Sequence, residues 1–143
     1  MRYLKRICVI DGQGGGIGTA LIRCLKEALG ESIELVALGT NAIAASQMLK
    51  AGANRAASGE NAIVRTSRTA DLIVGAISIG WANAMLGELT PKMAEAIMSS
   101  PAPKIFLPLS QEPVSLVGVS AEPLPHLVQQ LVYQKLKEVL PDV

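Results

Sequence analysis

The chain has 143 residues, half of them hydrophobic, which is enough to form one domain with a core that needs neither a disulfide nor a metal. Its 13 basic and 12 acidic side chains leave a formal charge of +1, and no run of Lys or Arg is long enough to predict nucleic-acid binding. No stretch reaches the roughly 18 continuous apolar residues of a membrane span, and the first residues do not form a signal peptide. We therefore expect a single cytoplasmic domain over residues 1–143, with neither a nucleic acid nor a membrane as partner.

The first predicted elements are a strand and a helix joined by a glycine-rich turn. Residues Leu4–Ile10 form a short run rich in Ile and Val, which favours a buried parallel strand. Apolar residues recur at helical spacing over Ile17–Leu29, and Gly30 ends that pattern. Cys8 and Cys24 lie in these two elements at a spacing that fits no metal site, so we predict that both are small buried hydrophobic residues.

The same alternation continues along the chain. Further strands are predicted at Ile33–Leu38, Asn54–Ser58, Leu72–Ile77 and Lys104–Leu109. Further helices are predicted at Ala42–Lys50, Trp81–Leu89, Pro91–Met98 and Pro125–Leu140. The segment 59–70 fits neither pattern. Alternating strands and helices predict an α/β fold, a Rossmann-like doubly wound sheet that is mostly parallel and binds ligands at the carboxyl ends of its strands.

The last strands depart from this scheme in the predicted fold. Val114–Val119 follows Lys104–Leu109 after only a few residues, which leaves no room for a crossover helix. The sequence therefore predicts a C-terminal antiparallel strand pair before the terminal helix. The helices are apolar enough to leave surface that needs covering, so a homo-oligomer is also expected.

The turn after the first strand is the strongest indication of function. Its residues are Gly12, Gln13, Gly14, Gly15, Gly16, Ile17 and Gly18. Glycines let the backbone take positive φ and approach a ligand without interference from Cβ, and the following helix begins with free N–H groups that attract a phosphate. We expect a small phosphorylated ligand at this turn. The alternative is a tight strand-to-helix turn that binds nothing.

The spacing of Gly12, Gly16 and Gly18 resembles the cofactor-binding turn of short-chain dehydrogenases. That resemblance implies NAD(P) or another nucleotide as the cofactor. The Tyr-x-x-x-Lys pair of those enzymes has no counterpart, because Tyr133 is followed by Lys135 and Lys137. The resemblance therefore extends to the fold and the ligand without the reaction.

The end of the second predicted strand lacks the acidic residue that binds the ribose in an ordinary NAD site. Thr40 and Asn41 stand there instead. Their side chains could hydrogen-bond a ribose or a second phosphate, or they could serve only to cap the next helix.

Other polar residues lie near the ends of the third and fourth strands. They are Glu60, Asn61, Ser78, Asn83 and Glu88. Either glutamate could act as a general base or bind a ribose, although a glutamate near a helix start is more often only solvated.

Two further polar residues are weaker candidates for chemistry. Asp11 ends the first strand, and fixing the turn through hydrogen bonds to the nearby backbone is a better explanation for it than binding Mg²⁺. His126 has no orienting partner evident in the sequence, which argues against a catalytic base.

Several segments together resemble a family of small bacterial proteins grouped as a domain of unknown function. The segments are IDGQGGGIG, ALGTNAIA, MLKAGA, GENAI and ANAMLGELTP. The resemblance implies a Rossmann-like nucleotide-binding protein and transfers no catalytic residue. Two hypotheses follow: a binding module that acts as a sensor or subunit, and a small NAD(P)-dependent oxidoreductase or phosphometabolite enzyme whose site is completed by an oligomer partner.

Overall fold

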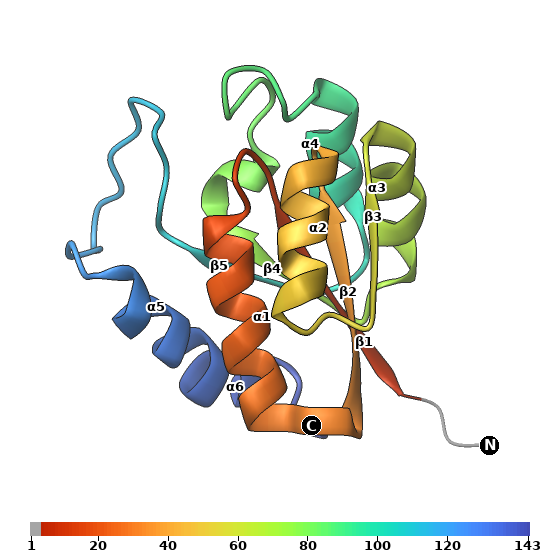
Figure 1. Cartoon of the computed structure of the whole chain (residues 1–143). Coiled ribbons are helices and arrows are strands. Elements are labelled where there is room, and N and C mark those ends of the chain that lie inside the picture. The colour runs from red at the N-terminus through yellow and green to blue at the C-terminus, as the bar shows by residue number, and fades with distance from the viewer. Residues whose placement is uncertain (1–3) are drawn as a thin grey trace.

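A computed structural model of the chain describes residues 4–143 and shows a five-stranded parallel sheet with helices on both faces (Figure 1). The strands lie in the order β3-β2-β1-β4-β5. Their bounds are β1 Lys5–Asp11, β2 Ile33–Gly39, β3 Arg55–Ser58, β4 Leu72–Ala76 and β5 Lys104–Leu107. The chain steps outward from β1 to β3 and then crosses to β4 on the other side of β1. The order of the strands therefore reverses between β1 and β4, which is where doubly wound folds bind ligands.

The central strand β1 is buried on both faces. It pairs with β2 from Lys5 to Asp11 and with β4 from Ile7 to Val9. Ile7 and Val9 belong to one hydrophobic cluster, whereas Cys8 and Ile10 belong to the other. Burial raises the pKa of the Cys8 thiol to about 12, so Cys8 is a packing residue, as predicted.

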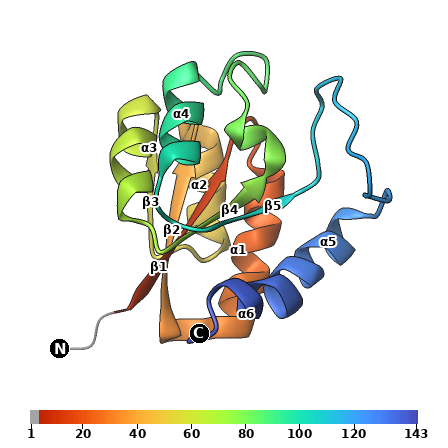
Figure 2. The same ribbon diagram turned by 180° about the vertical axis from the view of Figure 1, so that it is seen from behind.

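The helices divide between the two faces of the sheet. Figure 1 shows α1 (Gly16–Leu29) and α2 (Ala42–Ala51) covering one face. Figure 2, from behind, shows α3 (Glu60–Thr66) and α4 (Pro91–Ser99) covering the other. The C-terminal helical region packs beside α1 and consists of α5 (Leu124–Gln130), a π-helical turn and α6 (Leu136–Val139). The doubly wound α/β fold is confirmed.

The predicted antiparallel strand pair is wrong. Within the described chain, β5 ends at Leu107 and Val114–Val119 is not a strand. Residues 108–123 instead form a long arm that projects from the body (Figure 1). Prolines at both ends and in the middle of this segment lack the N–H group that a strand ladder needs. The large apolar residues Val114, Leu116, Val117 and Val119 of the arm are exposed, and Val117 is exposed completely.

The predicted helix Trp81–Leu89 is also wrong. These residues form a series of turns in which Asn83, Met85 and Leu86 have φ between 57° and 68°. A right-handed helix cannot contain such residues. A helix does form in the segment 59–70, whose sequence was ambiguous, where α3 is followed by a short 3₁₀ turn.

Candidate functional site

The glycine-rich turn links the carboxyl end of β1 to the start of α1. Gln13 and Gly15 both have positive φ, of 49° and 77°. The Gly15 N–H group donates to the Gly12 carbonyl over 2.9 Å, which closes the turn, and Gly15 then caps α1 without any side-chain hydrogen bond. The amide of Gly16, the first residue of α1, therefore has no hydrogen-bond partner among residues 4–143, as a ligand site at a helix N-terminus requires.

Asp11 holds the turn from beneath. One carboxylate oxygen accepts from the Gly12 N–H group and the other from the Gly18 N–H group, each over 2.7 Å. The side chain is buried, and this burial raises the pKa of Asp11 although backbone hydrogen bonds from Gly18, Gly12 and Ile17 act in the opposite direction. The predicted role of Asp11 in fixing the turn is confirmed.

The glycines of the turn differ in whether the structure has room for a side chain at their positions. A Cβ on Gly12 or Gly18 would collide with Met85 or Met48, and one on Gly15 would press on the backbone of Ala44. These glycines are required by the packing.

Gly14 and Gly16 are different. A Cβ on either would meet nothing within 4 Å, and neither has positive φ. Their N–H groups have no hydrogen-bond partner among residues 4–143. The fold does not require glycine at these two positions, and the space in front of them is open to a ligand.

Thr40 and Asn41 lie beside the turn, as predicted, and both contact Glu88. The Oε1 atom of Glu88 accepts hydrogen bonds from the Thr40 hydroxyl, the Asn41 side-chain amide and the Gln13 N–H group, over 2.7, 2.8 and 2.8 Å. Burial raises the pKa of Glu88, but these three hydrogen bonds outweigh it and hold the pKa below its ordinary value. Glu88 is therefore a carboxylate at neutral pH. Asn41 also caps α2, which confirms its predicted role as a helix cap, and ligand binding by Thr40 and Asn41 stays a prediction.

A cavity of about 260 Å³ opens at the same edge of the sheet. Gln13 and Ile17 form one wall, and Ser78, which follows β4, forms part of another. The base of the arm closes the cavity with Leu109, Ser110, Gln111 and Glu112. None of the described residues that line the cavity is basic. A phosphate bound here would therefore depend on backbone amides and the helix dipole rather than on a cation.

Three predicted site residues do not contact the turn. Glu60 accepts a hydrogen bond from the Thr90 hydroxyl over 2.6 Å at the start of α4, and Asn61 is exposed in the first turn of α3. Asn83 is exposed as well, and its N–H group donates to the Leu89 carbonyl. These residues have structural or solvent-facing positions because β3 is the edge strand, separated from β1 by β2, and residue 83 lies in a turn rather than on a helix. His126 is exposed on α5.

Sequence reasoning missed the cavity residues supplied by the arm. Ser110, Gln111 and Glu112 were assigned to a connection between two strands that do not pair. Met85, which also lines the cavity, was assigned to a helix. No motif in the sequence marks these residues, because their position depends on the path of long irregular segments.

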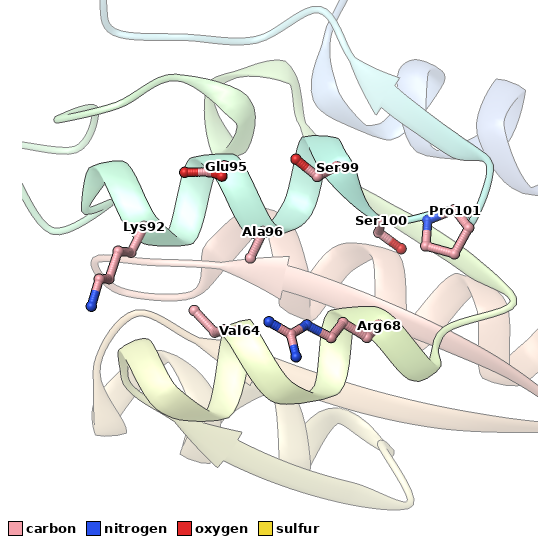
Figure 3. Close-up of a pocket in the computed structure, with 8 residues that line it drawn as sticks. All are labelled: Val64, Arg68, Lys92, Glu95, Ala96, Ser99, Ser100 and Pro101. Carbon is pink, nitrogen blue, oxygen red and sulfur yellow. The ribbon is translucent and has the colours of Figure 1, made fainter.

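A second groove, of about 390 Å³, lies between α3 and α4 on the other face of the sheet. Figure 3 shows Arg68 extending along this groove, with Lys92 at one end and Ser99 and Ser100 toward the other. It contains none of the predicted site residues. Its polar and basic groups come mainly from exposed helix surfaces, in contrast to the cavity at the glycine turn.

No helix within residues 4–143 has both the length and the apolar character needed to cross a membrane. No curated protein matches the sequence. Among solved structures, the fold is similar to a dodecameric FMN-dependent UbiX-like decarboxylase from Escherichia coli O157:H7, with 14% identity, 94% of this chain and 93% of that chain covered, and a TM-score of 0.48. It is also similar to a universal stress protein in complex with cAMP, with 21% identity, 74% and 98% covered, and a TM-score of 0.41.

The sequence match is more extensive. Residues 6–140 match the family described as Domain of unknown function (DUF3842), which is nearly the whole chain and includes the glycine turn, Glu88 and the arm. The chain therefore belongs to the DUF3842 family.

Proposed function

We propose that the crevice between the carboxyl ends of β1 and β4 binds a nucleotide or a phosphorylated metabolite, and that the protein acts as a sensor or as a subunit of a larger system. The observation that carries this proposal is the state of Gly14 and Gly16. Neither N–H group has a hydrogen-bond partner among residues 4–143, a Cβ at either position would meet open space, and the fold has no use for a glycine there. A phosphate is the ligand that such a helix start favours.

The adjoining cavity supports a ligand larger than a phosphate. Gln13 and Ile17, which flank the two open glycines, line it, and Ser78 and the arm residues add hydrogen-bonding groups on the far side. Part of the ligand would occupy this space while the phosphate stays at the turn. NAD(P) is one member of the proposed class, alongside mononucleotides and sugar phosphates.

A thermal-shift screen against NAD, NADP, ATP, cAMP and sugar phosphates tests this function. A ligand at 100 times its Kd adds about 2.7 kcal/mol of stability, which raises Tm by roughly 8 °C in a chain of this size. In the variant Gly16→Val the side chain fills the open space, so the shift should disappear while the protein remains folded.

The variant Arg23→Val is the matched control, because it places the same side chain on the exposed surface of the same helix. It should keep the full shift. An unchanged shift in Gly16→Val, or no shift for any compound with the wild type, would contradict the proposal.

A small enzyme is the second candidate, and one observation favours it. Ser78 and Glu88 both reach the neighbourhood of the turn, as that hypothesis requires: Ser78 shares the cavity with Gln13, and Glu88 accepts from the Gln13 N–H group. Turnover of a ligand found in the screen, lost in Ser78→Ala while binding persists, would support catalysis over binding alone.

We also propose that the protein forms a homo-oligomer through the arm. Val114, Leu116, Val117 and Val119 are all exposed on it, and such a group of apolar side chains is costly to leave in water. Light scattering should report a mass above that of one chain, and the double variant Val114→Asp with Val117→Asp should reduce it to the monomer. A monomeric wild type would exclude this assembly.

A further inference from the structure

The acidic group that is missing from the end of β2 is supplied from elsewhere in the chain. Glu88 belongs to the connection between β4 and α4, 48 residues after Thr40, yet its Oε1 atom accepts from Thr40 and Asn41, the first residues after β2. The third hydrogen bond, from the Gln13 N–H group, places the same oxygen beside the glycine turn. The carboxylate therefore lies between the end of β2 and the turn, next to the proposed phosphate position.

The two carboxylate oxygens of Glu88 are in different states. Oε1 accepts all three of the hydrogen bonds, whereas Oε2 accepts none from residues 4–143. The side chain is half-buried, and Oε2 remains accessible, because no buried side-chain oxygen of the described residues lacks a hydrogen-bond partner. One oxygen anchors the group, and the other is free to accept hydrogen bonds from a ligand.

The donors that anchor Glu88 are themselves fixed. Asn41 accepts from the Ala44 N–H group over 2.8 Å and donates to the Gln13 carbonyl over 3.0 Å. Its side chain is thus held at three points, counting Glu88. A carboxylate bound to such donors does not need to reorganise when a ligand arrives, which is a property of specific binding sites.

The backbone conformation around Glu88 places its side chain at this position. Asn83, Met85 and Leu86 have left-handed conformations, each of which costs of order 1 kcal/mol in a non-glycine residue. Hydrogen bonds between Asn83 and Leu89 and between Gly87 and Asn83 close the segment on itself. A simpler connection from β4 to α4 would not bring Glu88 to β2.

A carboxylate accepts hydrogen bonds and cannot donate them. The free oxygen therefore suits hydroxyl groups, and a pair of neighbouring hydroxyls suits it best. A phosphate also only accepts at its charged oxygens, and it would meet a like charge here. The position beside the turn thus favours a ribose with free hydroxyls and opposes a phosphorylated ribose.

We propose that Glu88 recognises the ribose of the bound nucleotide through Oε2, which makes the site specific for ribonucleotides with a free 2′-hydroxyl. This inference rests on the proposed function, because it assumes that the nucleotide's phosphate lies at the turn. Glu88 then does the work of the acidic residue that ordinary dinucleotide sites carry at the end of the second strand.

Calorimetric titration with two pairs of probes tests the inference. The pairs are ATP with 2′-deoxy-ATP, and NAD with NADP. We expect the wild type to bind the first member of each pair at least about tenfold more tightly, the effect of one charge-assisted hydrogen bond or one repulsion. In Glu88→Gln both preferences should shrink to about threefold or less, because the amide neither repels a phosphate nor accepts as strongly. Glu95→Gln, on the exposed surface of α4, is the matched control and should keep both preferences.

The possible results separate this inference from the proposed function. If the wild type binds the members of each pair equally well, the inference is wrong and the proposed nucleotide site is unaffected. This result does not depend on any variant. If Glu88→Gln binds inorganic phosphate and every nucleotide more tightly, Glu88 competes with the ligand for the donors, and ribose recognition is again wrong. If the wild type binds none of the four nucleotides, the inference fails, whereas the proposed function fails only if the other phosphorylated compounds of the thermal-shift screen do not bind either.

Discussion

The charged side chains at the two ends of β1 have different kinds of hydrogen-bond partner. At the amino end, the Arg6 guanidinium is 2.5 Å from a carboxylate oxygen of Glu34 and donates to the Thr69 hydroxyl over 2.7 Å. The other oxygen of Glu34 pairs with Arg55 over 3.0 Å. At the carboxyl end, the partners of Asp11 and Glu88 among residues 4–143 are amides and a hydroxyl.

The difference separates a structural region from a binding region. At the amino end each oxygen of Glu34 has a cationic partner, so that network is complete within the protein. At the carboxyl end one oxygen of Glu88 and two backbone amides have no partner among the described residues, and a cavity lies beside them. A fold of this class gathers its unsatisfied groups at the edge where ligands bind.

The largest expected effect is at Asp11. Asp11→Ala leaves two buried N–H groups without acceptors, and we expect a loss of about 3 kcal/mol in the free energy of unfolding, measured by urea denaturation. Asp11→Asn should lose less, because one oxygen acceptor remains. A loss below about 1 kcal/mol in Asp11→Ala would mean that water replaces the carboxylate and that the turn does not depend on it.

A smaller effect is expected at Thr40. Thr40→Val keeps the shape of the side chain and removes the hydroxyl that donates to Glu88, so we expect a loss of about 1 kcal/mol in the same denaturation experiment. The hydroxyl of Thr66, the last residue of α3, donates to no carboxylate in the described chain, and Thr66→Val is the control. Equal losses in the two variants would show that the contact with Glu88 adds nothing.

A still smaller effect, which depends on pH, is expected at the amino end. Burial raises the pKa of Glu34, but the hydrogen bonds and charges of Arg6 and Arg55 outweigh it, so the pKa lies below its ordinary value of 4.5. The stabilisation is then present above pH 4.5 and is lost as the pH falls through the lower pKa of the folded state.

Glu34→Gln tests this expectation. It should reduce the free energy of unfolding by about 0.5 kcal/mol at pH 7, since the pair is partly exposed and screened by solvent. The difference from the wild type should decline as the pH is lowered below 4.5. A difference that persists undiminished at pH 2 would contradict the assignment.

The smallest expected effect has the opposite sign. Gly16→Ala adds a methyl group in open space at the first position of α1, so the helix should gain about 0.5 kcal/mol and Tm should rise by about 2 °C. Gly15→Ala is the contrasting variant: its φ of 77° and the nearby Ala44 backbone should make it destabilising. Destabilisation in both variants would mean that Gly16, too, is a structural glycine.

Much of this edge of the sheet could be predicted from the sequence. The run from β1 through the glycines to α1 has a local signature, and so does the Thr40-Asn41 pair at the start of α2. The proximity of Asp11 to the turn followed from its place at the end of a strand. Each of these predictions depends on residues that are close together in the chain.

The position of Glu88 beside the end of β2 could not be predicted in this way. The residues before it resemble a helix by their spacing, and only tertiary packing forces Asn83, Met85 and Leu86 into left-handed conformations. The arm raised the same difficulty, because Val114–Val119 is rich in Val, which favours a strand, but no partner strand is present in the described chain to pair with it. Long-range contacts, rather than local preference, decide both segments.

The contacts of Asn41 limit the amino acids that position 41 can accept. A helix cap normally accepts Ser, Thr, Asp or Asn with little difference in stability. Here the side chain must accept from Ala44 and also donate to Gln13 and Glu88, which only an amide can do. Asn41→Asp would keep the helix start and set a second negative charge beside Glu88. Other capping residues at position 41 would therefore allow the same fold, but only an amide there also keeps the Glu88 carboxylate in place.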